Sequence, residues 1–391
     1  MSRAQDIIGK LRQIATDPIG YAVKWKEQHS GKVIGIMPMN FPVELVHAAG
    51  ALPMLVQESQ EPITLGRSLI FEFYCGYTRS LVDQAATGKF DVLDAIYLVD
   101  HCVALLGAAD ALRYVLPKKP VYLSQFAASM DEALSPIQVR TKIGLLRDRL
   151  VDFCGVEISD DSLRDSVKLF NTNRQLLRDV YDQRRSGRLS ITAAEMQILV
   201  KSAMVMDVEE HTALLSEFIA ASDRTGSPEQ GRIRLHFSGH FCHAPKPELL
   251  EMIESCGTMI VDDDLFTGYR YISTDVAEKK EPLDALTDWY FERNDNVPCS
   301  TRAQKSADWE SYLLGTLVAD RAQGVIVLMP KFCEPHMLYY PELRKAFEER
   351  GVPHLLIETE HEGLALETIR VRGEAFIETI KRRAANLPEL M

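Results

Sequence analysis

Apolar residues in the first third of the chain fall into short continuous runs with amphipathic stretches between them. The runs predict strands at 32–37, 54–57, 95–100 and 121–124. The stretches between them carry apolar residues at three- and four-residue spacing, which is typical of helices that bury one face. Strands that are apolar throughout and joined by helices predict a parallel sheet that is covered on both faces.

The middle of the chain, residues 136–222, shows four helical patterns and no strand pattern. From residue 233 the alternation resumes, with strands predicted at 233–237, 259–261, 324–329 and 354–358. We therefore expect an α/β fold with two doubly wound parallel-sheet domains and a helical insertion between them. The expected boundaries are 1–135 for an N-terminal α/β domain with leading helices, 136–228 for the insertion and 229–391 for the C-terminal α/β domain.

Composition narrows the class of partner more than it narrows the fold. The 391 residues are 46% hydrophobic and 26% charged, which is ordinary for a soluble globular protein. A formal net charge of -12 argues against nucleic acid and anionic membrane as partners, because both need clustered positive charge. The first residues lack the continuous apolar run of a signal peptide, and no stretch is long enough to span a membrane. These features predict a cytoplasmic protein whose seven cysteines are reduced or bound to metal.

Cys, His or carboxylate side chains come shortly after four of five predicted strands, those at 95–100, 233–237, 259–261 and 324–329 but not the one at 32–37. In open α/β sheets, ligands bind beyond the carboxyl ends of the strands, so residues just after a strand are the first candidates for a site. The candidates are His101 and Cys102, then His240, Cys242 and His243, then the run from Asp262 to Asp264, and finally Cys333 with Glu334. This enrichment predicts a functional site at the strand ends.

Cysteine spacing limits the kind of metal site. The chain has no close pair of the C-x2-C type that structural zinc sites and local ferredoxin motifs use. A metal site would therefore be assembled by the fold from distant loops, and thiolates select soft metals, iron–sulfur clusters among them. Spacing alone favours scattered buried cysteines over a shared metal site. We expect Cys154 and Cys256 to be core residues, whereas Cys299 is either a loop thiol or close to the site.

Other chemistries receive less support from the sequence. His240, Cys242 and His243 could hold zinc, but the sequence favours a packing cysteine beside a site-facing His240. Cys102 adjoins His101, yet neighbours on an extended segment face opposite sides, which disfavours a nucleophile with its base. The run 262–264 either binds a divalent ion or caps a helix. The chain has no phosphate-binding loop and no dinucleotide-binding glycine motif.

Several segments, in their order along the chain, resemble one family. They are PMNFPVELVHAAGALP at 38–53, Cys75 after an aromatic stretch, Cys102 after AIYLVDH, VDDDLFTGYR at 261–270 and Cys333 within KFCEP. Together they resemble the 2-hydroxyacyl-CoA dehydratase and benzoyl-CoA reductase family, most closely the small, C-type cluster-binding subunits of ATP-dependent benzoyl-CoA reductase. One departure is Val103, where many relatives carry an acidic residue after the cysteine.

The resemblance implies a [4Fe-4S] cluster on Cys75, Cys102 and Cys333. It also implies a hetero-oligomer with a homologous cluster-binding subunit, served by separate ATP-hydrolysing iron–sulfur activator subunits, which suits a chain without a phosphate loop. The implied activity is that of an oxidoreductase, the low-potential reductive dearomatisation of benzoyl-CoA. The alternatives are a lyase subunit that dehydrates a 2-hydroxyacyl-CoA and a non-catalytic partner subunit. We expect His240 to donate a proton, and Asn40 and Glu44 to line the substrate site.

Overall fold

The computed structural model describes residues 2–37, 40–222, 231–239, 242, 244–363 and 365–386, and its strands form two parallel sheets. In the first sheet the order is β2 (Leu52–Leu55), β1 (Val33–Ile36), β3 (Ala95–Val99) and β4 (Val121–Ser124). In the second it is β6 (Thr258–Asp263), β5 (Ile233–Ser238), β7 (Gly324–Pro330) and β8 (His354–Thr359). Both sheets share one topology, in which the second strand along the chain lies outside the first and the third lies on the other side. This confirms the predicted fold class.

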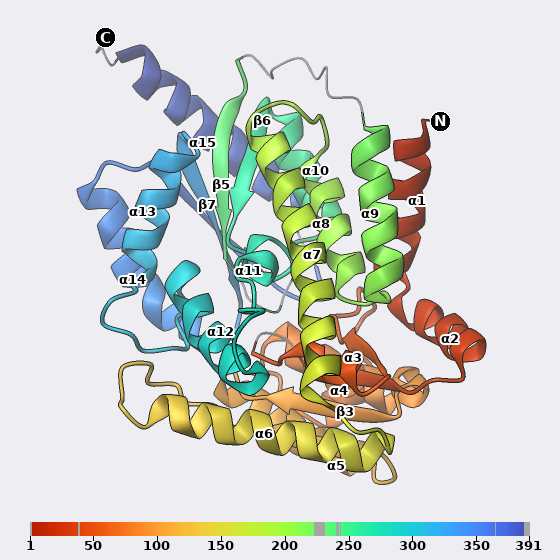
Figure 1. Cartoon of the computed structure of the whole chain (residues 1–391). Coiled ribbons are helices and arrows are strands. Elements are labelled where there is room, and N and C mark those ends of the chain that lie inside the picture. The colour runs from red at the N-terminus through yellow and green to blue at the C-terminus, as the bar shows by residue number, and fades with distance from the viewer. Residues whose placement is uncertain are drawn as a thin grey trace.

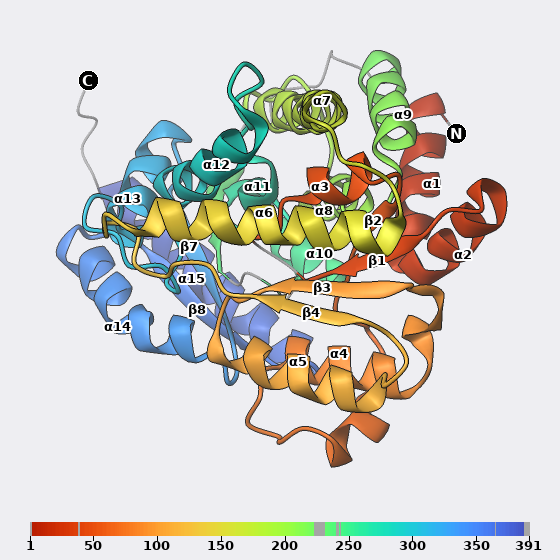
Figure 2. The same cartoon turned by 60° about the horizontal axis from the view of Figure 1, so that its bottom comes forward.

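Helices cover both faces of the first sheet. Figure 2 shows α4 (Gly76–Ala86) and α5 (Val103–Val115) on one side, and α3 (Val43–Ala48) and α6 (Ser135–Cys154) on the other. Every residue of β1, β2 and β3 is buried, because side chains on both faces of each strand meet a helix layer. The continuous apolar runs in the sequence follow directly from this double coverage.

The second sheet is covered in the same way. On one face, α10 (Pro247–Ser255) and α15 (Leu366–Asn386) pack their apolar side chains against β5, β6 and β7. On the other face, α13 (Trp309–Ala319) and α14 (Glu334–Glu349) pack against β7. Figure 1 shows α13 and α14 together beside this sheet, with α15 behind it.

In its described residues, the predicted insertion contains helices and no strand. Its described residues form α6, α7 (Asp160–Arg185), α8 (Ala193–Ala203) and α9 (Val208–Ala221), and α1 (Arg3–Thr16) packs beside α8 and α9. The long helix α7 forms buried ion pairs with helices of both α/β halves. Arg174 pairs with Glu44 of α3 at 2.9 Å, and Arg184 pairs with Glu254 of α10 at 2.7 Å. The domain boundaries at 135 and 228 stay a prediction.

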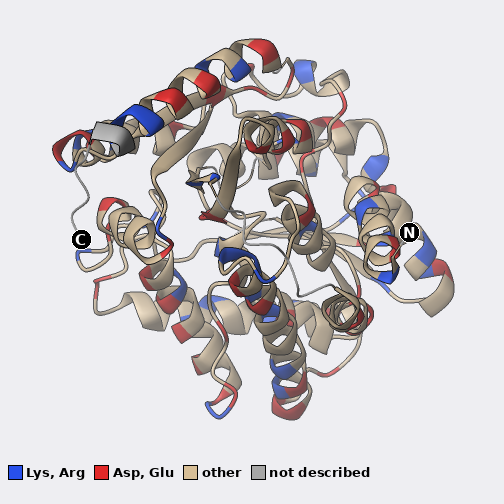
Figure 3. Ribbon diagram, turned by 90° about the horizontal axis from the view of Figure 1, so that it is seen from above, with Lys and Arg blue, Asp and Glu red and all other residues tan. Residues whose placement is uncertain are grey.

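Five further elements complete the described fold. They are α2 (Pro18–His29), the 3-10 helices η1 (Leu65–Ser68) and η2 (Lys89–Val92), and the helices α11 (Tyr269–Ile272) and α12 (Pro282–Asn296). The outer helices carry charges of both signs, which lie interspersed along them in the view of Figure 3. Within the described residues, no helix combines the length and the apolar character that crossing a membrane requires.

Helix starts divide into two groups by their capping chemistry. Thr192 begins α8 with a capping box, in which its hydroxyl accepts from the Glu195 amide at 3.1 Å and its own amide donates to the Glu195 carboxylate at 2.9 Å. Ser159 begins α7 through the Ser162 amide at 3.1 Å. In contrast, α4, α5 and α14 begin without a side-chain capping hydrogen bond. The N-cap residue of each of these three helices is a cysteine.

Candidate functional site

Three cysteines that are far apart in the sequence occupy equivalent local positions. Cys75 is the N-cap of α4, Cys102 that of α5 and Cys333 that of α14. Each lies in the connection that follows a strand, namely β2, β3 and β7. Because β3 and β7 are the third strands of two sheets with the same order, Cys102 and Cys333 hold corresponding places in the two halves.

These three cysteines line one cavity of about 370 Å³. Its wall combines residues from the ends of both sheets, so the strand ends of one sheet face those of the other across it. The sizes of small-molecule and cofactor pockets begin near 300 Å³, so the volume is sufficient for a compact group. The cavity thus brings together Cys102 and Cys333, which were predicted from their places after strands, and Cys75, which the family resemblance implied.

The electrostatics of the cavity favour an anionic occupant. Three helix N-termini point their positive dipole ends toward the cysteines. Burial nevertheless raises the pKa of the Cys102 thiol to about 12, and burial also raises the pKa of Cys75 and of Cys333. Without a metal the thiols therefore hold their protons at neutral pH, and a metal that binds them must displace those protons.

A fourth cysteine, Cys242, lines the same cavity. It was not predicted from the sequence to lie with the other three. It lies just after β5 and is 9% exposed. Burial, followed by the neighbouring Cys102 and Cys75, raises the pKa of its thiol well above the usual value. Its position after a predicted strand could have placed it at the site, but the histidines on either side suggested a separate zinc site.

The 299–302 loop closes one side of the cavity. The Cys299 sulfur lies 2.9 Å from the Thr301 hydroxyl and 3.9 Å from Nε2 of His101, a cavity residue. Arg302 donates to the Asp100 carbonyl at 2.8 Å and to the Thr301 carbonyl at 3.0 Å. It thereby joins this loop to the end of β3. Sequence spacing gave no sign of Thr301 or Arg302.

Backbone strain marks the approach to Cys333. Phe332 has a φ of 64°, in the left-handed region that costs a residue with a side chain about 1–2 kcal/mol. The next residue, Cys333, then begins α14 with its side chain on the cavity wall. Strained backbone of this kind tends to occur at functional sites, where the surrounding structure holds it in place.

The other predicted site residues lie away from this cavity or outside the described residues. Glu44 is fully buried, and its Oε1 accepts two hydrogen bonds from Arg174 at 2.9 Å each. Asn40 is 7% exposed, and neither residue is part of the cavity wall. His240 lies outside the residues that the structure describes. The roles of Asn40, Glu44 and His240 stay predictions.

The acidic run 262–264 spans the end of β6, and its carboxylates bond to other residues of the protein. Asp263 accepts from the Tyr181 hydroxyl at 2.7 Å, and Asp264 accepts from the Trp309 indole at 2.6 Å. These contacts favour the capping and packing interpretation of the run over a divalent-ion site.

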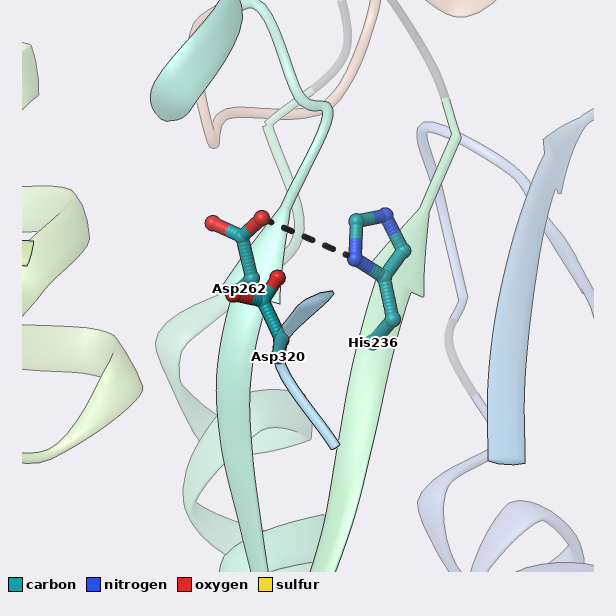
Figure 4. A group of neighbouring side chains, drawn as sticks. All are labelled: His236, Asp262 and Asp320. Carbon is teal, nitrogen blue, oxygen red and sulfur yellow. Dashed lines mark ion pairs between the residues drawn. The ribbon is translucent and has the colours of Figure 1, made fainter. Parts of the chain in front are cut away.

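Asp262 belongs to a buried group with His236 and Asp320, drawn in Figure 4. The ligand-type atoms of these three side chains lie within 4.8 Å of one another, which no other trio of His, Cys, Asp or Glu achieves in the described part of the chain. Arg185 pairs with Asp262 at 2.5 Å and with Asp320 at 3.6 Å. Arg185 of α7 thus already pairs with both carboxylates, so the group is accounted for as an ion-pair network that joins α7, Asp262 of β6 and Asp320 at the end of α13.

Comparison with known proteins identifies the family. The family model described as 2-hydroxyglutaryl-CoA dehydratase, D-component, matches residues 38–380. The C-type subunit of benzoyl-CoA reductase from Thauera aromatica is 28% identical over 96% of this chain and 98% of its own length. The (R)-phenyllactyl-CoA dehydratase beta subunit of Clostridium sporogenes is 28% identical over 97% of this chain and 100% of its own. The beta subunit of (R)-2-hydroxyglutaryl-CoA dehydratase from Acidaminococcus fermentans is 23% identical over 96% and 99%. These relatives are subunits of reductases and dehydratases, and the chain belongs to the 2-hydroxyglutaryl-CoA dehydratase D-component family.

Proposed function

We propose that this chain is the iron–sulfur subunit of an ATP-dependent reductase of the benzoyl-CoA reductase type, with a [4Fe-4S] cluster on Cys75, Cys102 and Cys333. The observation that carries the proposal is the convergence of these three cysteines, each at the start of a helix, on one cavity between two sheets. When bound, the cluster would supply low-potential electrons for the dearomatisation of an aromatic acyl-CoA.

The spacing of the sulfurs supports a cluster over a single ion. At least one pair among the three sulfurs is more than 4.8 Å apart, since the cysteines form no group within that limit. Two thiolates on one zinc ion are at most about 4.6 Å apart, because each Zn–S bond is about 2.3 Å long. Ligands of different irons in a cluster are held farther apart than ligands of one ion. The three cysteines are therefore not arranged as a compact set of ligands for one ion.

The residues around the cavity have definite tasks in this proposal. Cys75, Cys102 and Cys333 bind the cluster as thiolates, and the three helix N-termini offset its negative charge. Phe73, Val103 and other apolar side chains on the cavity wall limit the access of water. Exclusion of water disfavours the more negative, reduced state and so keeps the potential low. ATP hydrolysis is assigned to separate activator subunits.

A second candidate function is the radical dehydration of a 2-hydroxyacyl-CoA. The specific observation in its favour is the identity of 28% to (R)-phenyllactyl-CoA dehydratase, equal to the identity to the benzoyl-CoA reductase relative. The cavity serves either activity, because both begin with the transfer of one electron to a CoA thioester. The two candidates differ in the thioester that they turn over. An assay of the purified complex with each class of thioester measures this difference.

Anoxic purification tests the cluster itself. The wild-type chain should be brown and hold about four irons. Cys75→Ala, Cys102→Ala and Cys333→Ala should each lose most of this iron, whereas Cys256→Ala should keep it. Cys256 is a suitable control because its thiol donates to the Met252 carbonyl at 3.3 Å at the end of α10. A colourless wild-type chain, or iron that is indifferent to all three variants, would rule the proposal out.

The reaction is tested with the assembled complex, ATP and a strong reductant. We expect reduction of benzoyl-CoA and no water loss from 2-hydroxyacyl-CoA esters. Turnover of the 2-hydroxyacyl-CoA alone would assign the chain to the dehydratase branch and leave the cluster proposal intact.

A further inference from the structure

Cys242 is placed like the three proposed cluster ligands. It lines the same cavity as Cys75, Cys102 and Cys333, and its side chain is 9% exposed. It follows β5, which pairs in parallel with β7, the strand that precedes Cys333. Because neighbouring parallel strands end at the same edge of the sheet, the segments that carry Cys242 and Cys333 start side by side. The cavity wall therefore carries four thiols from four different strand ends.

The remaining three cysteines of the chain are placed differently. Cys256 donates its thiol hydrogen to the Met252 carbonyl at 3.3 Å, and Cys154 is the last residue of α6. Cys299 lies beside the cavity, where its sulfur is 2.9 Å from the hydroxyl of Thr301, a residue of the cavity wall. None of these three lines the cavity. Of the seven cysteines, four line the cavity, Cys299 lies beside it without being part of the wall, and Cys154 and Cys256 lie away from it, so Cys242 is the only further cysteine on the wall among the described residues.

We propose that Cys242 is the fourth thiolate ligand of the [4Fe-4S] cluster, an inference that rests on the proposed function. On binding, the Cys242 thiol releases its proton to solvent, and its sulfur bonds the iron that Cys75, Cys102 and Cys333 leave open. Clusters of this type are commonly held by four cysteines.

This ligation has a functional consequence. An iron with four sulfide and thiolate bonds has no position for a substrate oxygen, so the cluster in this chain would pass electrons without binding the thioester. Any bond between iron and substrate would then form on the homologous subunit. The chain is thus assigned to electron relay within the complex.

The closing experiment measures whether one iron is open. The full chain, wild type and Cys242→Ala, is purified anoxically, loaded with iron and sulfide, reduced and studied by electron paramagnetic resonance with and without cyanide, a small ligand for an open iron. We expect the wild-type spectrum to be unchanged by cyanide and that of Cys242→Ala to shift. Mild oxidation should remove one iron of about four from the variant and give a three-iron signal. Cys256→Ala should behave as wild type.

Each outcome has a distinct meaning. A wild-type spectrum that shifts with cyanide, or a Cys242→Ala spectrum that does not, would overturn the role of Cys242 and leave the three-cysteine cluster standing. A wild-type chain without iron would overturn the proposed function and this inference with it. If Cys242→Ala does not fold, Cys242→Ser replaces it, and the cyanide response of the wild type still decides whether an iron is open.

Discussion

A cysteine at the start of a helix is a poor choice for the helix itself. Ser, Thr, Asp and Asn are the favoured N-cap residues because their oxygens accept hydrogen bonds from the first amides. The start of α5 has Cys102 with extended backbone, at φ −151° and ψ 168°, and no side-chain capping hydrogen bond. Cys75 and Cys333 likewise begin their helices without such a bond. Local choices that conflict with the fold usually mark functional sites.

This conflict leads to a prediction for Cys102→Ser. The serine hydroxyl has the geometry of a normal N-cap, so we expect the iron-free chain to gain about 0.5–1 kcal/mol in its free energy of unfolding. The same variant should lose most of its iron, because a hydroxyl is a poor ligand for iron in a sulfide cluster. Denaturant unfolding of the iron-free chain and iron analysis measure the two effects. Cys102→Ala, which cannot cap, should lose iron without the gain; equal stability of the two variants would contradict the argument.

His211 joins three helices of the insertion and makes their packing sensitive to pH. It lies on α9, accepts from the Asn173 side chain of α7 at 2.8 Å through Nδ1, and donates to the Leu199 carbonyl of α8 at 3.1 Å through Nε2. Burial lowers its pKa from 6.5 to about 4, so the folded chain holds it neutral. The unfolded chain then binds one more proton between these two pH values.

The extra proton bound by the unfolded chain determines how stability changes with pH. Stability is fully present above pH 6.5 and falls as the pH drops toward 4, because protons favour the unfolded state. A pKa difference of about 2.5 units corresponds to a loss of about 3 kcal/mol. Unfolding free energies of wild type and His211→Gln, compared from about pH 7 to about pH 4, should show a shallower decline for the variant. Parallel curves for the two proteins would refute the assignment.

The elements were more predictable than their contacts. Continuous apolar runs predicted each of the eight strands found in the described residues, and one prediction was shifted: the strand expected at 54–57 is β2, Leu52–Leu55. The short helix α11 was not predicted, because a single turn has no measurable periodicity. The pairing of Glu44 with Arg174 was not predicted either, since it depends on how α3 packs against α7. A local motif cannot distinguish a buried ion pair from a substrate contact.

The whole cavity was less predictable than its parts. Cys102 and Cys333 were indicated by their places after strands, whereas Cys75, separated from β2 by a long loop, needed the family resemblance. Cys242 could be joined to the others only once the two sheets were seen to face each other at their strand ends. That arrangement comes from packing over the whole chain, which no short segment encodes.

Apolar side chains surround the mouth of this cavity, and we name Phe71, Phe73, Val103 and Leu338 the mouth patch. Their exposed fractions are 68%, 62%, 68% and 80%. The last three line the cavity, and the ring of Phe71 stacks on that of Phe73 with centroids 5.2 Å apart. Apolar side chains grouped at the surface commonly mark a protein contact. In the proposed complex, the homologous subunit would cover the mouth patch and complete the exclusion of water.

Leu338→Lys tests this contact with little risk to the fold, because the side chain is exposed. Charged substitution inside an apolar interface should weaken association with the co-expressed homologous subunit at least about tenfold, or about 1.4 kcal/mol. Val318→Lys is the matched control, since Val318 is 79% exposed on α13 and outside the cavity wall. Sedimentation of the anoxic complex measures the association, and iron per isolated chain should stay unchanged in both variants. If Leu338→Lys assembles as well as Val318→Lys, the subunit docks elsewhere and the cavity mouth needs another cover.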